Sequence, residues 1–332
     1  MSSSRVVDNV AKDGLAPLVS RFAQALEGYQ RSSRTFQVLS TLNSAIETPS
    51  EDPPKAILVL DSSFNPPTLA HKRMALSALF KDDDLAGHSS SGSSDNSNSS
   101  RSNDQPSRIL LLLAINNADK TPKPAAFPQR LAMMDVFGQE LLSAIAAADP
   151  HGDRYKCAGV DVAVTTEPYF HAKAAAVAAD VFYYRGAQTL GSEEKENQAP
   201  EQVYLTGFDT LIRIFNPKYY PDGSMAQVLD PFFAHARLRV TMRTDAEWGD
   251  AAAQRAYLEE LRRGGLERVG GRTEWAGRIE MVEGRRDGQE VVSSTKVREA
   301  VVRKDWDALK KLVSEGVTEW IREQELYTEA SA

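Results

Sequence analysis

One stretch, Lys55 to Leu79, constrains the fold of this chain more than any other. It reads KAILVLDSSFNPPTLAHKRMALSAL: a short apolar run, a turn rich in serine and proline, then apolar residues at helical spacing. Ala56 to Leu60 has the composition of a strand buried on both faces. A helix that starts at Thr68, directly after a strand and a tight turn, directs backbone N–H groups to a place where a phosphate can bind. His71 lies in the first turn of that helix, so its ring can reach the same place.

The composition limits the class of protein. A chain of 332 residues with a 42% hydrophobic share can bury a real core in one large or two modest domains. A net charge of -7 argues against a nucleic-acid partner, which would require a basic face. The single cysteine, Cys157, excludes an internal disulfide and a cysteine zinc cluster. No signal peptide or membrane-spanning run is evident, so we expect a soluble protein of the cytoplasm or nucleus without a membrane partner. The oligomeric state stays open.

The chain divides into an extension and a main domain. Residues 1–50 are expected to form an N-terminal helical extension, because the apolar residues of Leu15 to Leu42 are spaced mostly near helical periods. The main domain should cover residues 55–328. Two tracts interrupt it: residues 84–107, rich in serine and expected to be disordered, and the polar insertion at residues 191–200.

Apolar runs and helical patterns alternate along the main domain. After the first strand, further strands are predicted at Arg108 to Ala114, Gly159 to Val164, Gln202 to Thr206, Leu238 to Met242 and Ile279 to Val282. Helical patterns follow most of them, including the one that Val292 to Arg298 begins. This alternation predicts an α/β fold with a parallel sheet. We expect the helix starts near Thr68 and Ser294 at opposite ends of that sheet, an arrangement that suits a triphosphate.

The first motif resembles that of a known superfamily. Ser62 to His71, SSFNPPTLAH, resembles the G-[S/T]-F-[N/D]-P-x-[H/T]-x-x-H signature of the nucleotidylyltransferases, and its Thr-x-x-His form is similar to the nicotinamide mononucleotide adenylyltransferases. Ser62 stands where the family usually has glycine. The segments around Lys120 and Arg130, Gly207-Phe208-Asp209, and VSSTKVR resemble later family motifs. Together the motifs cover about residues 55–322 outside the two insertions, and they are most similar to a divergent fungal branch.

This resemblance implies a Rossmann-like nucleotidylyltransferase fold and a reaction. AMP would pass from ATP to nicotinamide mononucleotide, forming NAD and pyrophosphate, with Mg²⁺ bridged by the phosphates and Asp209 the one candidate to approach it. The implied catalytic residues are Thr68, His71 and Lys120. The implied ATP and phosphate contacts are Ser62, Ser63, Phe64, His71, Lys123, Gly207, Asp209, Ser293, Ser294, Thr295 and Arg298. The implied mononucleotide contacts are Asn65, Asn117, Arg130, Tyr169 and Phe170.

Several alternatives stay open from the sequence. Lys120 and Lys123 are rival candidates for the phosphate-binding lysine. A cytidylyltransferase, a simple ATP hydrolase and a non-catalytic nucleotide-binding scaffold are compatible with the first motif. A dehydrogenase and a P-loop NTPase are disfavoured, because no Gly-x-Gly-x-x-Gly follows the first strand and no Gly-x-x-x-x-Gly-Lys-Ser/Thr occurs.

Overall fold

The computed structural model describes residues 4–43, 54–80, 106–116, 124–150, 157–184, 200–220, 223–243, 248–284 and 291–328. Asn117, Lys120, Lys123 and nearly all of the two predicted insertions lie outside these residues. Of the serine-rich tract, only its last two residues are described, and Ser107 already belongs to a strand, so the predicted boundary at 107 is slightly late.

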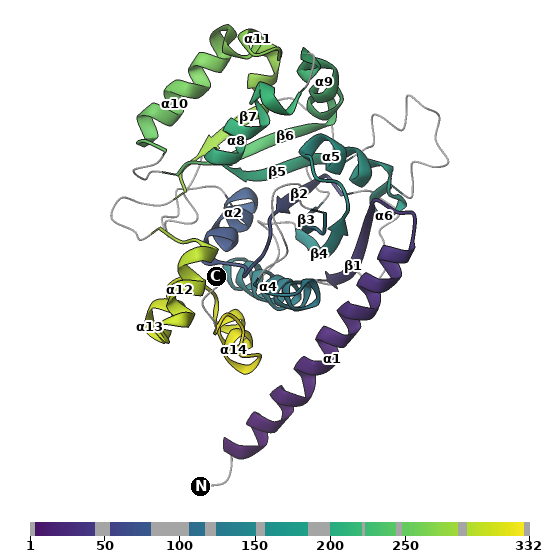
Figure 1. Ribbon diagram of the computed structural model, residues 1–332, viewed down its shortest axis with the longest axis vertical. Helices are drawn as coiled ribbons and strands as arrows, with labels where there is room; N and C mark the ends of the chain where they lie inside the picture. The colour runs from purple at the N-terminus through teal and green to yellow at the C-terminus, as the bar shows by residue number, and fades with distance from the viewer. Residues whose placement is uncertain are drawn as a thin grey trace.

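A seven-stranded sheet forms the centre of the described chain (Figure 1). Its strands are β1 Phe36–Asn43, β2 Ala56–Asp61, β3 Ser107–Ala114, β4 Cys157–Thr165, β5 Glu201–Gly207, β6 Ala236–Thr241 and β7 Ile279–Val282. They lie in the order β1-β4-β3-β2-β5-β6-β7, and every pairing except β1 with β4 is parallel. The six parallel strands therefore have the order of a doubly wound Rossmann sheet. The predicted α/β class is confirmed.

The N-terminal region differs from its prediction. Helix α1, Ser4–Arg31, is helical as expected, but Phe36–Asn43 is a strand that pairs antiparallel with β4. Phe36 is buried opposite Thr165, and the register shifts between Val38 and Ser40. Pairing along the edge of β4 satisfies the backbone of this segment, which outweighs a weak helical spacing. The sheet is consequently mixed, and the extension is part of it rather than wholly helical.

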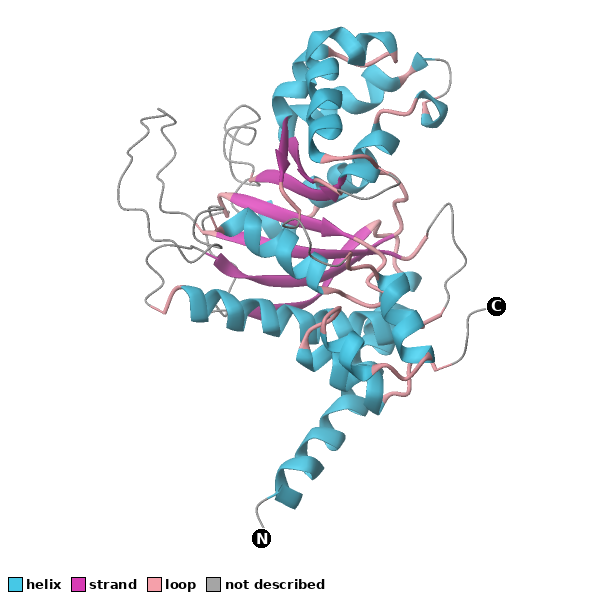
Figure 2. Cartoon of the chain, turned by 90° about the vertical axis from the view of Figure 1, so that its left-hand side faces the viewer, coloured by secondary structure: helices cyan, strands magenta, loops and turns pink. Residues whose placement is uncertain are grey.

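Helices cover both faces of the sheet, as the side view shows (Figure 2). Alternate residues of β2 point to opposite faces: Leu58 and Leu60 belong to one apolar core, Ile57 and Val59 to the other. The first core lies under α1, α2 Leu69–Leu79, α4 Phe127–Ala148, α12 Ser294–Val302, α13 Trp306–Lys310 and α14 Glu315–Glu323. The second lies under α5 Phe170–Ala179, α6 Val181–Tyr184, α8 Phe208–Ile214, α9 Met225–His235, α10 Ala251–Glu260 and α11 Leu266–Arg268.

Helix α4 is long and apolar, a combination that occurs both in core helices and in membrane-spanning helices. Among the described residues it is the one helix long and apolar enough to cross a bilayer, and half of its most apolar window is buried. Its apolar residues, such as Leu131 and Met133, are fully buried in the first core. Met133 therefore packs in the core.

Candidate active site

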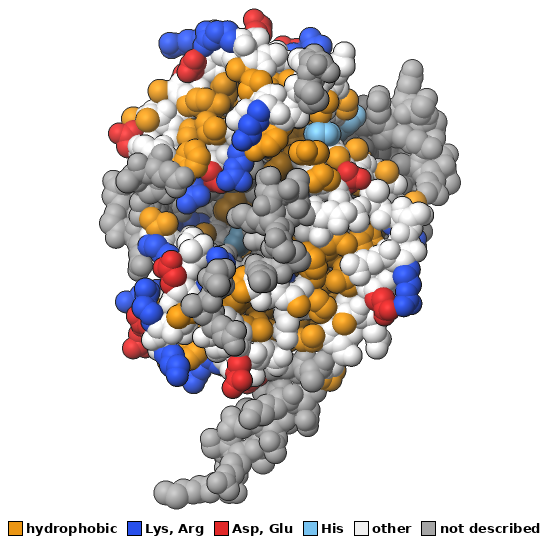
Figure 3. Space-filling view, viewed as in Figure 1, with side chains coloured by type: hydrophobic (Ala, Val, Ile, Leu, Met, Phe, Trp, Pro, Cys, Tyr) orange, Lys and Arg blue, Asp and Glu red, His pale blue; other side chains and the backbone are white. Residues whose placement is uncertain are grey.

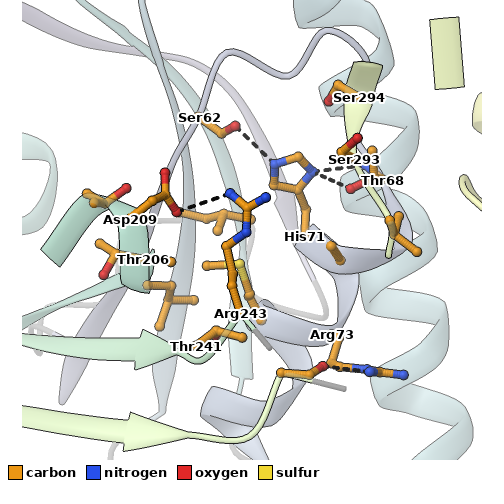
Figure 4. A pocket seen from close by; sticks show the side chains of 18 of the residues that line it. Ser62, Thr68, His71, Arg73, Thr206, Asp209, Thr241, Arg243, Ser293 and Ser294 are labelled. Carbon is orange, nitrogen blue, oxygen red and sulfur yellow. Dashed lines mark hydrogen bonds and ion pairs between the residues drawn. The ribbon is translucent and has the colours of Figure 1, made fainter. Parts of the chain in front are cut away.

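A cavity of about 660 Å³ opens at the carboxyl ends of β2, β5 and β6. The chain leaves β2 toward β3 on one side of the sheet and leaves β5 toward β6 on the other. The carboxyl ends of β2 and β5 thus form a topological switch point, the place where doubly wound α/β proteins bind ligands. The first motif enters the cavity from β2 and α2, and polar side chains enter from β5 and β6 (Figure 4).

His71 is held in one protonation state at the wall of this cavity. The backbone N–H of Thr68 donates to His71 Nδ1 at 3.0 Å. His71 thus accepts from the N-cap backbone, which is the role of the third helical residue in a capping box. An amide can only donate, so Nδ1 is the acceptor and the ring proton lies on Nε2. Burial lowers the pKa of His71 to about 4, so the ring is neutral near pH 7. Nε2 lies 3.0 Å from Ser62 Oγ, to which it donates (Figure 4).

Two helix N-termini meet at the cavity. Helix α2 starts after its N-cap Thr68, and α12 starts after Ser293, whose side chain accepts from the backbone of Lys296. Ser294 Oγ donates to the carbonyl of Pro66 at 2.9 Å, which joins the two helix starts directly. The expectation that they lie at opposite ends of the sheet is wrong. Both helices follow the carboxyl ends of parallel strands, and these ends share one edge.

The charged groups of the cavity favour an anionic ligand. Its lining cations are Arg73, Arg243 and Lys311, and its lining carboxylates are Asp61 and Asp209. Asp61 is neutralised by Lys173 of α5, whose Nζ lies 2.5 Å from its Oδ2. The protein surface around the cavity carries both signs of charge (Figure 3), and the chain is acidic overall. The cavity is therefore locally cationic on an acidic protein, as a polyphosphate site requires.

The end of β5 brings polar groups very close together. A Cβ added to Gly207 would lie 2.7 Å from Asp209 Oδ1, so the carboxylate can fold back only because residue 207 is glycine. Asp209 forms an ion pair with Arg243 of the neighbouring strand's exit loop at 3.4 Å. Thr206 Oγ1 lines the same corner, is buried, and has no hydrogen-bond partner in the described part of the chain. A buried hydroxyl of this kind is expected to bind a ligand or water.

The structure brings about half of the described candidate residues to the cavity. Those that line it are Ser62, Thr68, His71, Phe170, Gly207, Asp209, Ser293 and Ser294. The sequence reasoning missed Arg73, Thr206, Thr241, Arg243 and Lys311. Thr206, Thr241 and Arg243 sit at the ends of predicted strands, and that position was an available signal. Arg73 and Lys311 carry no local signal that separates them from surface cations.

Three implied ligand contacts instead support the first-motif loop. The ring of Phe64 is fully buried and lies 5.3 Å from that of His71. Asn65 is buried, and its Oδ1 accepts from Tyr327 Oη at 2.9 Å. Arg298 Nη1 donates to the Asn65 carbonyl at 2.9 Å, so its guanidinium is turned to the loop rather than the cavity. These contacts hold the loop in place, because the C-terminal helices fold back and bring Tyr327 and Arg298 against it.

The other candidates lie away from the cavity. Arg130 is buried, donates to the carbonyl of Ala125 at 2.8 Å, and has its pKa lowered by burial. Ser63 and Thr295 are exposed outside the cavity. Tyr169 is 45% exposed and stacks on His171, so Phe170 is the aromatic residue of this pair that lines the cavity.

Comparison with known proteins identifies the family. A Schizosaccharomyces pombe (strain 972 / ATCC 24843) protein, provisionally named nicotinamide mononucleotide adenylyltransferase, is 30% identical over 303 residues, which cover 91% of this chain and 95% of that protein. This chain belongs to the nicotinamide mononucleotide adenylyltransferase family. It is therefore a nucleotidyltransferase of NAD biosynthesis, and the fungal relative agrees with the branch that its motifs indicate.

Other comparisons with this nicotinamide mononucleotide adenylyltransferase family member are more distant. A Plasmodium falciparum nicotinic acid mononucleotide adenylyltransferase complexed with NaAD is 11% identical, with a TM-score of 0.39 over 82% of this chain and 97% of that chain. The same enzyme complexed with APC gives a TM-score of 0.37 over the same shares. No family model matches the sequence. These structural likenesses are weak, and the family assignment rests on the fungal relative.

Proposed function

We propose that this enzyme transfers the adenylyl group of ATP to nicotinamide mononucleotide, forming NAD and releasing pyrophosphate. The convergence of the α2 and α12 N-termini on one cationic cavity carries the proposal. Backbone N–H groups at two positive helix ends, in a cavity that Arg73 and Lys311 also line, suit a chain of phosphates better than a single anion. The family supplies the acceptor class.

The reaction needs no nucleophilic side chain. An oxygen of the mononucleotide phosphate attacks the α-phosphorus of ATP, and the bond to the bridging oxygen of pyrophosphate breaks. The enzyme then contributes by positioning the two phosphates and by stabilising the charge that grows on them. In this scheme the neutral His71 side of the cavity faces the transferred phosphate, and the lining cations face the leaving pyrophosphate.

The geometry of Ser62 and His71 argues against Ser62 as a nucleophile. A serine nucleophile needs a histidine nitrogen that accepts its proton. Here Nδ1 is already occupied by the Thr68 amide, so Nε2 carries the ring proton and donates to Ser62. A ring whose pKa is lowered to about 4 is also a weak base. The pair is built to donate rather than to deprotonate.

Magnesium fits this site as an ion that arrives with the triphosphate. Within the described ranges, no three or more His, Cys, Asp or Glu side chains gather to hold a metal. Asp209, paired with Arg243, lines the cavity and would approach a phosphate-bound ion or its water. When bound, the ion would neutralise phosphate charge, and the protein would add few direct ligands.

The test is a product screen with the purified chain and Mg²⁺. ATP and CTP are each supplied with nicotinamide mononucleotide, with nicotinic acid mononucleotide, and with no acceptor. Formation of NAD and pyrophosphate from ATP and nicotinamide mononucleotide supports the proposal. A cytidylyl product, release of ADP or AMP without an acceptor, or no turnover despite nucleotide binding would each replace it with one of the alternatives.

A further inference from the structure

We infer that the hydroxyl of Ser62 is the group that contacts the transferred phosphate, and that His71 acts through it. This inference rests on the proposed function, which places a phosphate against this wall of the cavity. Ser62 would then be a catalytic residue and His71 a positioning residue.

Ser62 is held at a fixed place on the cavity wall. It follows the last residue of β2, and its backbone N–H donates to the carbonyl of Leu112 on β3 at 3.3 Å. Its side chain is half-buried and lines the cavity (Figure 4). Ser62 and His71 both line the cavity, and the hydroxyl lies beside the ring at hydrogen-bond distance from Nε2.

The hydrogen-bond directions leave one proton free. Thr68 N–H donates to His71 Nδ1, so Nε2–H must donate, and its acceptor is Ser62 Oγ at 3.0 Å. The Ser62 oxygen thus accepts from the ring, and its own proton has no acceptor among the described protein atoms. Ser62 lines the cavity, so a ligand bound there can accept that proton.

Such a chain of hydrogen bonds makes a good donor to phosphate. A hydroxyl that accepts one hydrogen bond is polarised and donates another more strongly. A phosphate oxygen is an anionic acceptor, and its bond to a hydroxyl is short and strong. The competing arrangement, in which Ser62 turns away and the ring donates directly, would break the Ser62–His71 bond each time a ligand binds.

A double-mutant cycle separates these arrangements. Adenylyl transfer is measured for the wild type, Ser62→Ala, His71→Ala and the double variant, with Ser143→Ala as a control for loss of an exposed serine hydroxyl on α4. If His71 acts through the Ser62 hydroxyl, an arrangement called the relay below, Ser62→Ala lowers kcat by about 10²–10³. His71→Ala then adds less than about threefold in the Ser62→Ala background, because its effect passes through the missing hydroxyl. A Ser62→Ala rate at or above that of the wild type, or a full His71 effect in that background, would overturn the relay.

A spectroscopic measurement keeps the relay testable apart from turnover. The ¹⁵N-labelled wild type has five histidines, and His71→Ala identifies the signal of His71. The relay predicts an Nε2–H tautomer whose Nε2–H shift changes in Ser62→Ala and changes little on adding ATP. A large ATP-induced shift at Nε2–H shows direct donation by the ring and refutes the relay. If the wild type makes no dinucleotide, the proposed function fails while this measurement still decides which group meets the phosphate.

Discussion

The buried ion pair beside the cavity offers a stability test with a magnitude. Asp61 ends β2, Lys173 lies on α5, and their side chains are only 8% and 7% exposed. Lys173→Met keeps most of the side-chain volume but leaves the carboxylate without its cation. Removing one partner of a buried pair costs about 3–5 kcal/mol. Because Asp61 borders the cavity and water can reach it, we expect the lower end, about 3 kcal/mol, and a Tm lower by about 6 °C or more.

Urea and thermal unfolding of four proteins measure this effect. Asp61→Asn and the Asp61→Asn/Lys173→Met double variant complete the cycle with the wild type and Lys173→Met. The double variant should recover most of the lost stability, since it carries no unpaired buried charge. Arg255→Met is the matched control, because Arg255 pairs with Glu283 on the surface, with 54% and 73% exposure, and should cost less than about 1 kcal/mol.

The same variants report on the site. An unpaired carboxylate beside Ser62 would repel the triphosphate, so the KM for ATP should rise in Lys173→Met and fall again in the double variant. The reasoning is refuted if Lys173→Met is as stable as Arg255→Met. It is also refuted if the double variant is as unstable as Lys173→Met, because the loss would then come from packing rather than charge.

Three further predictions concern the loop and the cavity. The folded pKa of His71, about 4, lies below its ordinary value of 6.5, so between these values the unfolded state binds more protons and His71 lowers the stability as the pH falls. Urea unfolding at about pH 7 and about pH 4.5 should therefore show a smaller loss of stability at acid pH in His71→Asn than in the wild type. An equal loss in the two proteins would contradict this. Tyr327→Phe removes the hydroxyl that donates to the buried Asn65 Oδ1 and should lower the free energy of unfolding by about 0.5–1.5 kcal/mol, whereas an unchanged melting curve would show that this hydrogen bond does not stabilise the fold. Gly207→Ala puts a Cβ 2.7 Å from Asp209 Oδ1 and should raise the KM for ATP with little change in Tm; an unchanged KM would exclude a ligand role for this carboxylate.

The sequence by itself determined the features that depend on short-range pattern. The apolar runs of β2 to β7 and the helix starts at Thr68 and Ser294 follow from local composition, turn residues and capping, and all are present in the structure. The first motif also indicated the family. His71 could be placed on the cavity wall because it lies in the first turn of the helix that follows the motif.

Only the tertiary structure decided which of these features meet. The strand order places β5 and β6 beside β2, which brings Thr206 and Arg243 to the motif. Phe36–Asn43 forms a strand because it pairs with the edge of β4. The return of the C-terminal helices brought Arg298 to the backbone of the first-motif loop. Each outcome depends on contacts between residues far apart in the chain, and a local pattern carries no information about which distant groups will satisfy a side chain or a strand edge.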